Sequence, residues 1–563
     1  MSRIGGRGGV AGPLAAIRVP FASLAVRLGV TLRELAGVAA IFGLGAALRL
    51  VNLPVRGGWD SDQGTEMLGL RAALESGRLP TFGPEAISVS SSFHHGALYY
   101  DLLLPAAWLG NGDPTWVVAE IALLSLIVIP IVWWLARSIG GPAAGLAAAL
   151  LAAVSAALVS YATFIWNPTL VEPGAAIAYL GAWQAIRTRR PGWWAVAAIG
   201  GAVAVQAHIA AGIIALPLGL TFAFDLWRAG EAGPSRRRVA AWGAVGVAFF
   251  VLTYTPLIVS ELGSDFADTR GMLAYFSEPN SATSTALPLR VLFAAIRIVA
   301  WPLTRWPIVD FNPAFGLAFL VAATLMIGLV WRLGVTARPR RPVSSDAAVD
   351  ATVQVAAGPD VERTGTRFVG LCLLLVIVGL GIGLHAVSEV QELPTEQYHV
   401  VADPLVFVAA GLILGGLWRA IPMRRVTIAR RVVAVAAVAL LLAWNAGHWP
   451  PLTSPDGGWP AAQAAAARVE RDAAGSSIAL VPLYEPKGAD AYLYPLTLDG
   501  FTPAASDAAG VVVLLCDTFW LEGCGGAAET GWLASNGLTA SLTQIDRFPA
   551  APDRILTVYR RSP

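Results

Sequence analysis

The chain has 563 residues, of which 56% are hydrophobic and only 13% are charged. Soluble globular proteins carry about 25% charged residues, so this composition excludes an ordinary soluble fold and indicates a chain that lies largely in a bilayer. The formal net charge of +2 gives no reason to expect a nucleic-acid partner.

Residues 1–34 contain several arginines and no clear cleavage site after an apolar core, which predicts a cytoplasmic leader. Apolar segments of bilayer length then recur through 35–448 and predict about eleven transmembrane helices. The segments are 35–53, 115–136, 142–160, 168–187, 192–208, 210–227, 238–259, 313–332, 368–388, 402–420 and 430–447. Segments 97–110 and 286–304 are expected to lie along the membrane surface, because the first is short and the second carries Arg290 and Arg297.

Arginines gather at alternate turns, which the positive-inside rule assigns to the cytoplasm. The polar segment 334–366 is then a cytoplasmic linker, expected to be disordered. The long first loop, 54–114, and residues 449–563 face outward across the plasma membrane. Short β-like runs, Gly/Pro/Asp turns and Ala-rich stretches predict that 449–563 form a small extracytoplasmic α/β domain, in which Cys516 and Cys524 are expected to form a disulfide.

Two acidic residues follow the first predicted span. Asp60 and Asp62 precede a helical apolar pattern at Met67 and Leu70, so they lie at the start of a helix on the outer surface. Carboxylates there could hold a divalent metal such as Mg²⁺ or Mn²⁺, or accept the proton of an acceptor hydroxyl. The alternative is that they only cap the helix.

Further polar and aromatic residues interrupt the apolar sequence near the expected outer ends of the helices. Each has a structural interpretation as an interfacial aromatic, a capped helix break or a side chain that reaches the interface. A binding role is favoured because all of them fall on one membrane face in the predicted topology. These residues are His94 and His95, Tyr99, Trp166, Asn167 and Glu172, Gln206 and His208, and Tyr398 and His399.

The order of these motifs over residues 30–260 resembles the GT-C glycosyltransferases, especially bacterial relatives of protein O-mannosyltransferases and lipid A aminoarabinose transferases. The matching motifs are Asp62-Gln63 with a helix ending at Ser76-Gly77, His95-Gly96 before Tyr99, Asn167-Pro168, and Gln206-Ala207-His208. Gln63 and Asn167 stand where the family has acids.

The resemblance implies an inverting transfer of a hexosyl or pentosyl group from a polyprenyl-phosphate carrier to a glycan, lipid or protein hydroxyl. Asp62 would be the base, with Asp60 as an alternative carboxylate able to hold a metal. His95, His208 or that metal would neutralise the phosphate, and Trp166 and Tyr398 would stack on sugar rings. The remaining candidates, Gln63 included, would bind substrate.

Three other functions stay open. A secondary transporter usually shows inverted repeats and helices broken at mid-membrane, whereas this chain shows no repeat. A non-catalytic membrane scaffold could bind cell-wall glycan with its outer domain. An O-antigen ligase or polymerase would place its main polar loop late in the chain, not directly after the first span.

Overall fold

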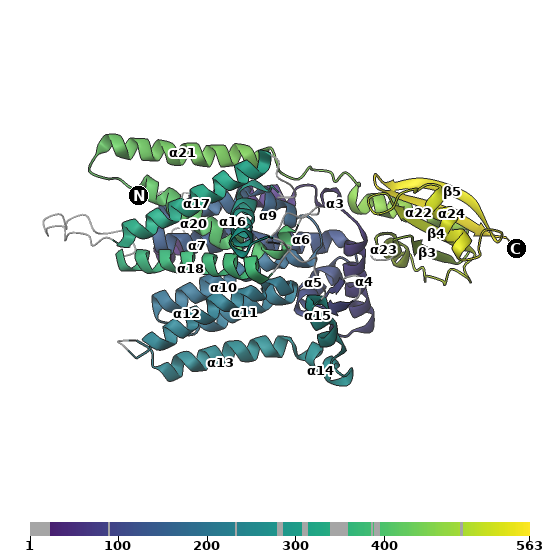
Figure 1. Cartoon of the computed structure of the whole chain (residues 1–563), viewed down its shortest axis with the longest axis horizontal. Helices are drawn as coiled ribbons and strands as arrows, with labels where there is room; N and C mark the ends of the chain where they lie inside the picture. The colour runs from purple at the N-terminus through teal and green to yellow at the C-terminus, as the bar shows by residue number, and fades with distance from the viewer. Residues whose placement is uncertain are drawn as a thin grey trace, which may run out of the picture.

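The computed structural model describes residues 23–87, 91–230, 233–277, 285–306, 313–337, 359–383, 387, 395–484 and 488–562. They form a helical bundle and a smaller domain beyond one end of it (Figure 1). The bundle helices are α2 (Leu32–Leu50), α6 (Pro114–Leu126), α7 (Val128–Gly140), α8 (Pro142–Val154), α9 (Ala156–Tyr161), α10 (Val171–Thr188), α11 (Trp193–Ala207), α12 (Ala215–Arg228), α13 (Arg236–Thr253), α16 (Leu287–Thr304), α17 (Pro313–Ala337), α18 (Pro359–Gly383), α20 (Asp403–Trp418) and α21 (Arg424–Ala446).

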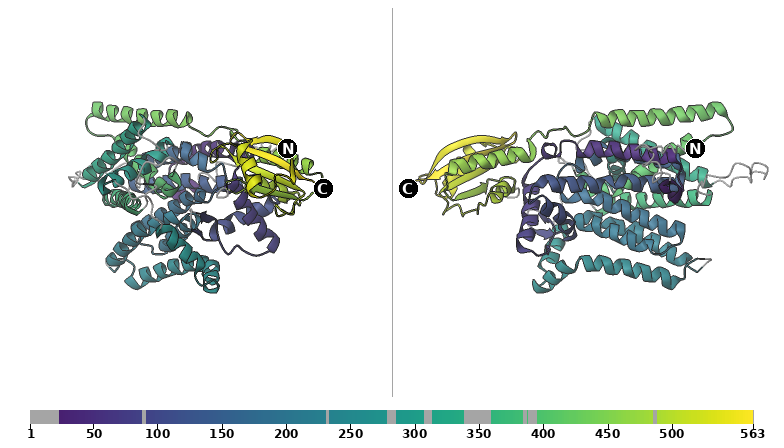
Figure 2. Two further views of the ribbon diagram at one scale, coloured as in Figure 1. Left: turned by 45° about the vertical axis from the view of Figure 1, so that its right-hand side comes forward. Right: turned by 180° about the vertical axis from the view of Figure 1, so that it is seen from behind.

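Among the described residues, seven helical stretches are long and apolar enough to cross a bilayer, or eight if α13 and α14 (Thr255–Gly263), bent by 55°, form one span. The protein is therefore a multi-pass helical membrane protein, and the count of about eleven spans stays a prediction. The arginine-bearing ends of α12 and α13 lie at the bundle end away from the smaller domain (Figures 1 and 2).

The predicted leader and linker are partly helical. α2 begins at Leu32, earlier than expected, because the Thr31 side chain caps it by accepting from the Glu34 nitrogen at 3.1 Å. α17 continues to Ala337 and α18 begins at Pro359. Glu362 in the first turn of α18 pairs with Arg332 of α17 at 2.5 Å, which explains why this end of the linker is ordered. Residues 1–22 and 338–358 lie outside the described residues.

The segment 286–304 differs from its prediction as a surface helix. It forms α16, one of the helices able to cross a bilayer, and all residues from 296 to 304 are buried. Arg297 is only 3% exposed and donates a hydrogen bond to Thr395. Its charge is thus enclosed by protein rather than lipid, which removes the cost that suggested a surface position.

α10 and α11 pack closely through small residues. A methyl group at Gly200 would lie only 2.4 Å from the backbone nitrogen of Ala178. Glycine at such contacts lets helix backbones approach in a membrane. The pairing brings the short helix η1 (Asn167–Leu170), which leads into α10, beside the end of α11.

Short elements cover the end of the bundle that faces the smaller domain (Figure 1). They are α3 (Leu53–Arg56), α4 (Ser61–Ser76), the antiparallel strands β1 (Glu85–Ile87) and β2 (Ser92–His94), α5 (Leu98–Leu109) and α15 (Ala267–Ser277). α5 is the segment expected to lie along the surface, and it packs between α4 and α6.

The C-terminal domain has a four-stranded sheet in the order β3-β4-β6-β5, parallel between β3 and β4 and antiparallel elsewhere. Its elements are α22 (Gly458–Ala473), β3 (Ile478–Pro482), α23 (Asp490–Leu498), β4 (Val511–Asp517), α24 (Ala527–Ser535), β5 (Leu542–Ala551) and β6 (Arg554–Arg561). Alternate residues of β4 pack on opposite faces: Val513 shares a core with Val469 of α22, and Leu514 with Leu533 of α24. Burial on both faces explains the unbroken apolar run of β4.

Trp59 joins the domain to the bundle. Its indole nitrogen donates to the Ala491 carbonyl at 2.7 Å, and its ring lies 4.6 Å from that of Trp459. α4 approaches α23 so closely that a methyl group at Gly64 would lie 2.1 Å from the Asp490 carbonyl oxygen. The start of α4, which carries the candidate acids, is therefore positioned by both the bundle and the outer domain.

Candidate active site

The start of α4 is a capping box. Asp60 is the N-cap, and its carboxylate accepts from the Asp62 nitrogen at 2.9 Å, while the Gln63 side chain accepts from the Asp60 nitrogen at 2.9 Å. The Gln63 amide also donates to the Ile165 carbonyl at 2.7 Å. Both ends of the Gln63 amide are thus engaged, so this residue positions α4 against the segment before Asn167.

Segments distant in the sequence meet beside this helix start. Asn167 donates to the Ala207 carbonyl at 2.7 Å, and Gln206 accepts from the Leu98 nitrogen at 3.2 Å and donates to Thr253 at 2.6 Å. Gly96 is required here, because a methyl group would lie 2.3 Å from the Gln206 oxygen.

Two histidines and a tyrosine complete this arrangement. The His208 ring lies 5.1 Å from that of His95 and 5.3 Å from that of Tyr398 in η4 (Glu396–Tyr398). We call the set His95, Asn167, Gln206, His208 and Tyr398 the outer junction, after the membrane face on which the sequence predicts them. The segments that carry these five residues thus contact one another.

The His95 side chain is buried, and its Nδ1 has no hydrogen-bond partner among the described residues. Burial, followed by the neighbouring His208 and His94, lowers the pKa of His95 well below its usual value. The lowered pKa favours a neutral imidazole, which can donate or accept a hydrogen bond.

The depressed pKa of His95 predicts a pH-dependent stability. Because the folded state binds this proton more weakly than the unfolded state, the stabilisation is complete above the ordinary pKa of about 6.5 and is lost as the pH falls below it, by up to about 1.4 kcal/mol per pH unit. Thermal unfolding of the purified protein between about pH 7.5 and 5 measures this loss. His95→Gln should lose less stability on acidification than the wild type. Identical pH dependence in the two proteins would show that His95 is not held neutral.

Other predicted residues lie outside the outer junction. The Nδ1 atom and backbone nitrogen of His94 both contact the Asp268 carboxylate, at 2.7 and 2.9 Å, so His94 ties β2 to α15. The Trp166 ring stacks on Phe164 at 5.8 Å and lies near Tyr161, which makes it part of an aromatic cluster.

The remaining predicted residues are buried among other polar groups. Glu172 of α10 lies beside Asp403 of α20, and His399 lies near Arg297. Tyr99 packs against Tyr100, and its hydroxyl has no hydrogen-bond partner in the described part of the chain. Cys516 and Cys524 form a disulfide that closes the loop after β4.

A polar cavity of about 280 Å³ lies against the first turn of α4. We call it the arginine cavity, because Arg56 of α3 and Arg305 line it, together with Gln63 and two aspartates, Asp60 and Asp456. Arg56 also donates to the Leu48 and Val51 carbonyls. Arg305 follows α16 and donates to the His448 carbonyl at 2.7 Å and to the Ser160 hydroxyl at 3.1 Å. Paired guanidinium groups at a cavity favour binding of a phosphate or carboxylate.

An apolar groove of about 480 Å³ runs between α17, α20 and α21. It includes Leu303 and Thr304 at the end of α16, and Trp444, whose indole nitrogen donates to the Thr304 carbonyl at 2.8 Å. Since Arg305 is the next residue, consecutive residues of the chain line the apolar groove and the polar cavity.

No protein-family model matches the chain, and no curated protein matches it in sequence. Two solved structures of ArnT from Cupriavidus metallidurans share its fold. The undecaprenyl-phosphate-bound structure has a TM-score of 0.58 at 13% identity, over 92% of this chain and 97% of that one. The apo structure has a TM-score of 0.55 at 13% identity, over 97% and 98%. The chain has the GT-C glycosyltransferase fold. The resemblance predicted from the motifs is confirmed at the level of the fold.

Within this GT-C fold, the described residues do not form the expected metal site. No group of three or more His, Cys, Asp or Glu side chains among them lies close enough to hold an ion. The Asp60 carboxylate, one of the two predicted ligands, accepts the capping bond from Asp62. Asp60 and Asp62 are two carboxylates and do not by themselves enclose a cation, so a divalent metal at this turn stays a prediction.

The GT-C fold also gathers residues that the sequence interpretation missed. Glu66 is buried one turn after Asp62 and shares a hydrogen bond with Tyr100. Burial raises the pKa of Glu66 well above its usual value, and the nearby Asp62 raises it further. The sequence does contain a sign of this position: Glu66 follows Asp62 by four residues, and residues four apart lie on the same face of a helix. No spacing or motif in the sequence links Arg56 or Arg305 to the candidate acids.

Proposed function

We propose that this protein is an inverting glycosyltransferase that moves one monosaccharide from a polyprenyl-phosphate carrier to an acceptor hydroxyl at the outer membrane face. One observation supports this most directly: Thr304 lines an apolar groove within the bundle, and the next residue, Arg305, lines a polar cavity together with Arg56. A polyprenyl phosphate has this same division, a long apolar tail that ends in an anionic head.

In this proposal the tail lies in the groove, and the phosphate lies between Arg56 and Arg305. Guanidinium groups suit this task because they stay charged and donate several hydrogen bonds in one plane. The ArnT structure of the same fold contains undecaprenyl phosphate, which favours this class of carrier here.

The proposed reaction is a single displacement. The acceptor oxygen forms a bond to the anomeric carbon as the bond from that carbon to the phosphate oxygen breaks. Asp62 takes the acceptor proton, and the polyprenyl phosphate leaves with the bonding electron pair, stabilised by the two arginines. Glu66 lies one turn after Asp62, and its pKa, raised by burial and by the Asp62 charge, favours its holding a proton near the proposed base.

The outer junction would bind the transferred sugar. Neutral imidazoles both donate and accept hydrogen bonds, which suits sugar hydroxyl groups. His208 accepts from the Ala210 nitrogen through Nδ1 at 3.2 Å, so its neutral form carries the proton on Nε2 and can donate there. The Tyr398 ring beside it offers an apolar face to a sugar.

The outer domain and the start of α4 would be extracytoplasmic. The arginine-bearing ends of α12 and α13 lie at the opposite end of the bundle (Figure 2), where the positive-inside rule places the cytoplasm.

The full-length protein in nanodiscs, supplied with polyprenyl-phosphate hexoses and pentoses, tests this function. We expect release of polyprenyl phosphate from one donor class and transfer of its sugar to a hydroxyl. Uptake of free sugar into proteoliposomes without donor cleavage would favour a transporter. Glycan binding without turnover of any donor would favour a scaffold.

A further inference from the structure

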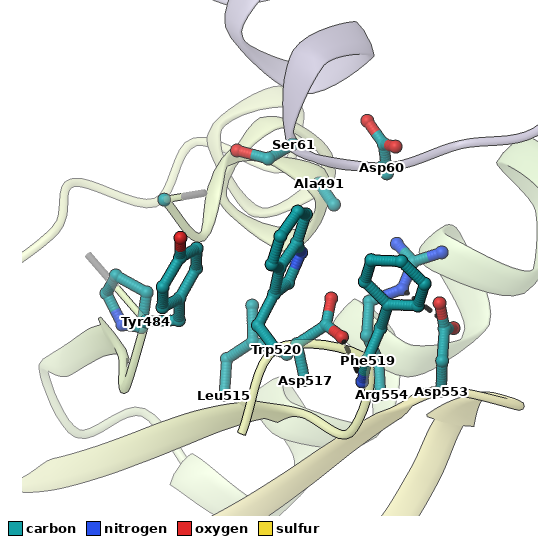
Figure 3. Close-up of a pocket in the computed structure, with 12 residues that line it drawn as sticks. Asp60, Ser61, Tyr484, Ala491, Leu515, Asp517, Phe519, Trp520, Asp553 and Arg554 are labelled. Atoms are coloured by element: carbon teal, nitrogen blue, oxygen red, sulfur yellow. Dashed lines mark hydrogen bonds and ion pairs between the residues drawn. The ribbon is translucent and has the colours of Figure 1, made fainter. Parts of the chain in front are cut away.

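A second cavity, of about 220 Å³, lies between the first turn of α4 and the outer domain (Figure 3). Asp60 and Ser61 line it from the α4 side. Tyr484, Asp517, Trp520 and Arg554 line it from the outer domain. Because Asp60 also lines the arginine cavity, the two cavities lie on either side of the same helix start.

Aromatic rings line this second cavity. Tyr484 and Trp520 stack with their ring centres 5.1 Å apart and their planes only 5° from parallel, and Phe519 meets Trp520 edge to face at 4.8 Å. Figure 3 shows the three rings side by side below Ser61 and Asp60. Large rings at an open cavity, rather than in a core, provide flat apolar surface for a ligand. The C–H face of a sugar ring is also flat and apolar, so it can pack against these aromatic rings.

The charge of the cavity differs from that of the arginine cavity. Asp60, Asp517 and Asp553 bring three carboxylates to it, against a single guanidinium group from Arg554. Arg554 already donates to the Trp59 carbonyl at 2.8 Å and to Asp456 at 3.3 Å, and it contacts Asp553 at 3.4 Å. The excess of negative charge disfavours phosphate and uronic acids. Carboxylates instead accept hydrogen bonds from neutral hydroxyl groups.

The loop that carries these groups is held in place on both sides. The disulfide between Cys516 and Cys524 encloses Asp517, Phe519 and Trp520. The Thr518 nitrogen donates to the Asp553 carbonyl at 2.7 Å, and the Phe519 nitrogen donates to the Asp517 carboxylate at 2.9 Å. A braced loop loses little conformational entropy when a ligand binds.

We infer that this cavity is the acceptor subsite and binds a sugar residue of a neutral glycan. The sugar packs against the stacked pair of Trp520 and Tyr484 and bonds through its hydroxyl groups to Asp60 and Asp517. The inference rests on the proposed function, because it places the acceptor next to the helix start that carries the proposed base. It selects a glycan among the three acceptor classes.

Binding of neutral trisaccharides tests the subsite without any need for turnover. Mannotriose and arabinotriose are the probes, a hyaluronan tetrasaccharide is the anionic comparator, and saturation-transfer NMR on the full-length protein in nanodiscs is the measurement. We expect at least one neutral probe to bind, and Trp520→Ala to weaken it about tenfold. Trp520→Phe keeps an aromatic surface and should retain most of the affinity. Tyr484→Ala and Tyr484→Phe form a second matched pair.

The outcomes separate the subsite from the proposed function. Probe binding that depends on Trp520, without turnover of any donor, keeps the subsite and rejects the transferase. Donor turnover with an acceptor KM that Trp520→Ala and Tyr484→Ala leave unchanged overturns the subsite. Tighter binding of the hyaluronan fragment than of both neutral probes also overturns it, as does failure of both neutral probes to bind.

Discussion

Replacing Asp62 with asparagine is expected to reduce kcat about a hundredfold or more, within the range that a positioned general base contributes. The Asp62 carboxylate lies in the first turn of α4, and its backbone nitrogen donates to the cap residue Asp60. Asparagine preserves that backbone bond and the side-chain shape and removes only the basic oxygen. Turnover of the polyprenyl-phosphate sugar at saturating donor and acceptor measures the effect.

Asp60→Asn is the matched control for this prediction. Asparagine caps helices about as well as aspartate, so α4 should remain formed. Because Asp60 lines the acceptor subsite, its substitution should act mainly on the acceptor KM and less on kcat. Equal losses of kcat in the two variants would mean that the negative charge of this turn matters rather than one base. Full activity of Asp62→Asn would reject Asp62 as the base.

Part of this site could be read from local sequence. His95-Gly96, Asn167-Pro168 and the Gln206–His208 motif are polar interruptions in apolar surroundings, and polar groups in a membrane protein usually converge on a functional region. The structure joins these segments through Gly96 against Gln206 and Asn167 against Ala207. The order of the motifs in the GT-C family and the topology predicted from the arginines together predict that these three motifs lie on one membrane face.

The arginine cavity could not be predicted in the same way. Its lining comes from four stretches far apart in the chain, around Arg56, Ser160, Arg305 and Asp456. An arginine at a helix end is ordinarily an interfacial anchor, so neither Arg56 nor Arg305 points to a ligand cavity from the sequence alone. The same limit explains the error at α16, where the Thr395 partner of Arg297 lies 98 positions further along the chain.

In the outer domain, too, the secondary structure could be predicted from local sequence, but the contacts between distant segments could not. The apolar runs at β3, β4 and β6 predict strands, and their alternation with helical stretches predicts an α/β domain. That Trp520 and Tyr484 would stack opposite Asp60 depends on a contact between α23 and α4, where Gly64 admits the Asp490 carbonyl. No periodicity within either segment encodes that contact.

Arg305→Gln is expected to weaken binding of the polyprenyl-phosphate donor about tenfold to a hundredfold, since a hydrogen bond to a charged group contributes roughly 1.5–3 kcal/mol. Arg305 lines the arginine cavity and directly follows Thr304, which lines the apolar groove. Without it, the tail can still enter the groove, but the phosphate loses one of two guanidinium partners. The donor KM, and direct binding of polyprenyl phosphate to the protein in nanodiscs, measure the loss.

Arg290→Gln is the matched control, because Arg290 lies in the first turn of the same helix α16 and donates to the Ile382 carbonyl at 2.9 Å. It should change donor binding far less than Arg305→Gln. Arg305→Lys should fall between them, because a lysine keeps the charge but cannot donate in the planar geometry that reaches both His448 and Ser160. If Arg305→Gln and Arg290→Gln weaken donor binding equally, the phosphate does not lie in the arginine cavity. The assignment of the donor phosphate to the arginine cavity and of the acceptor to the second cavity, both lined by Asp60, would then fail with it.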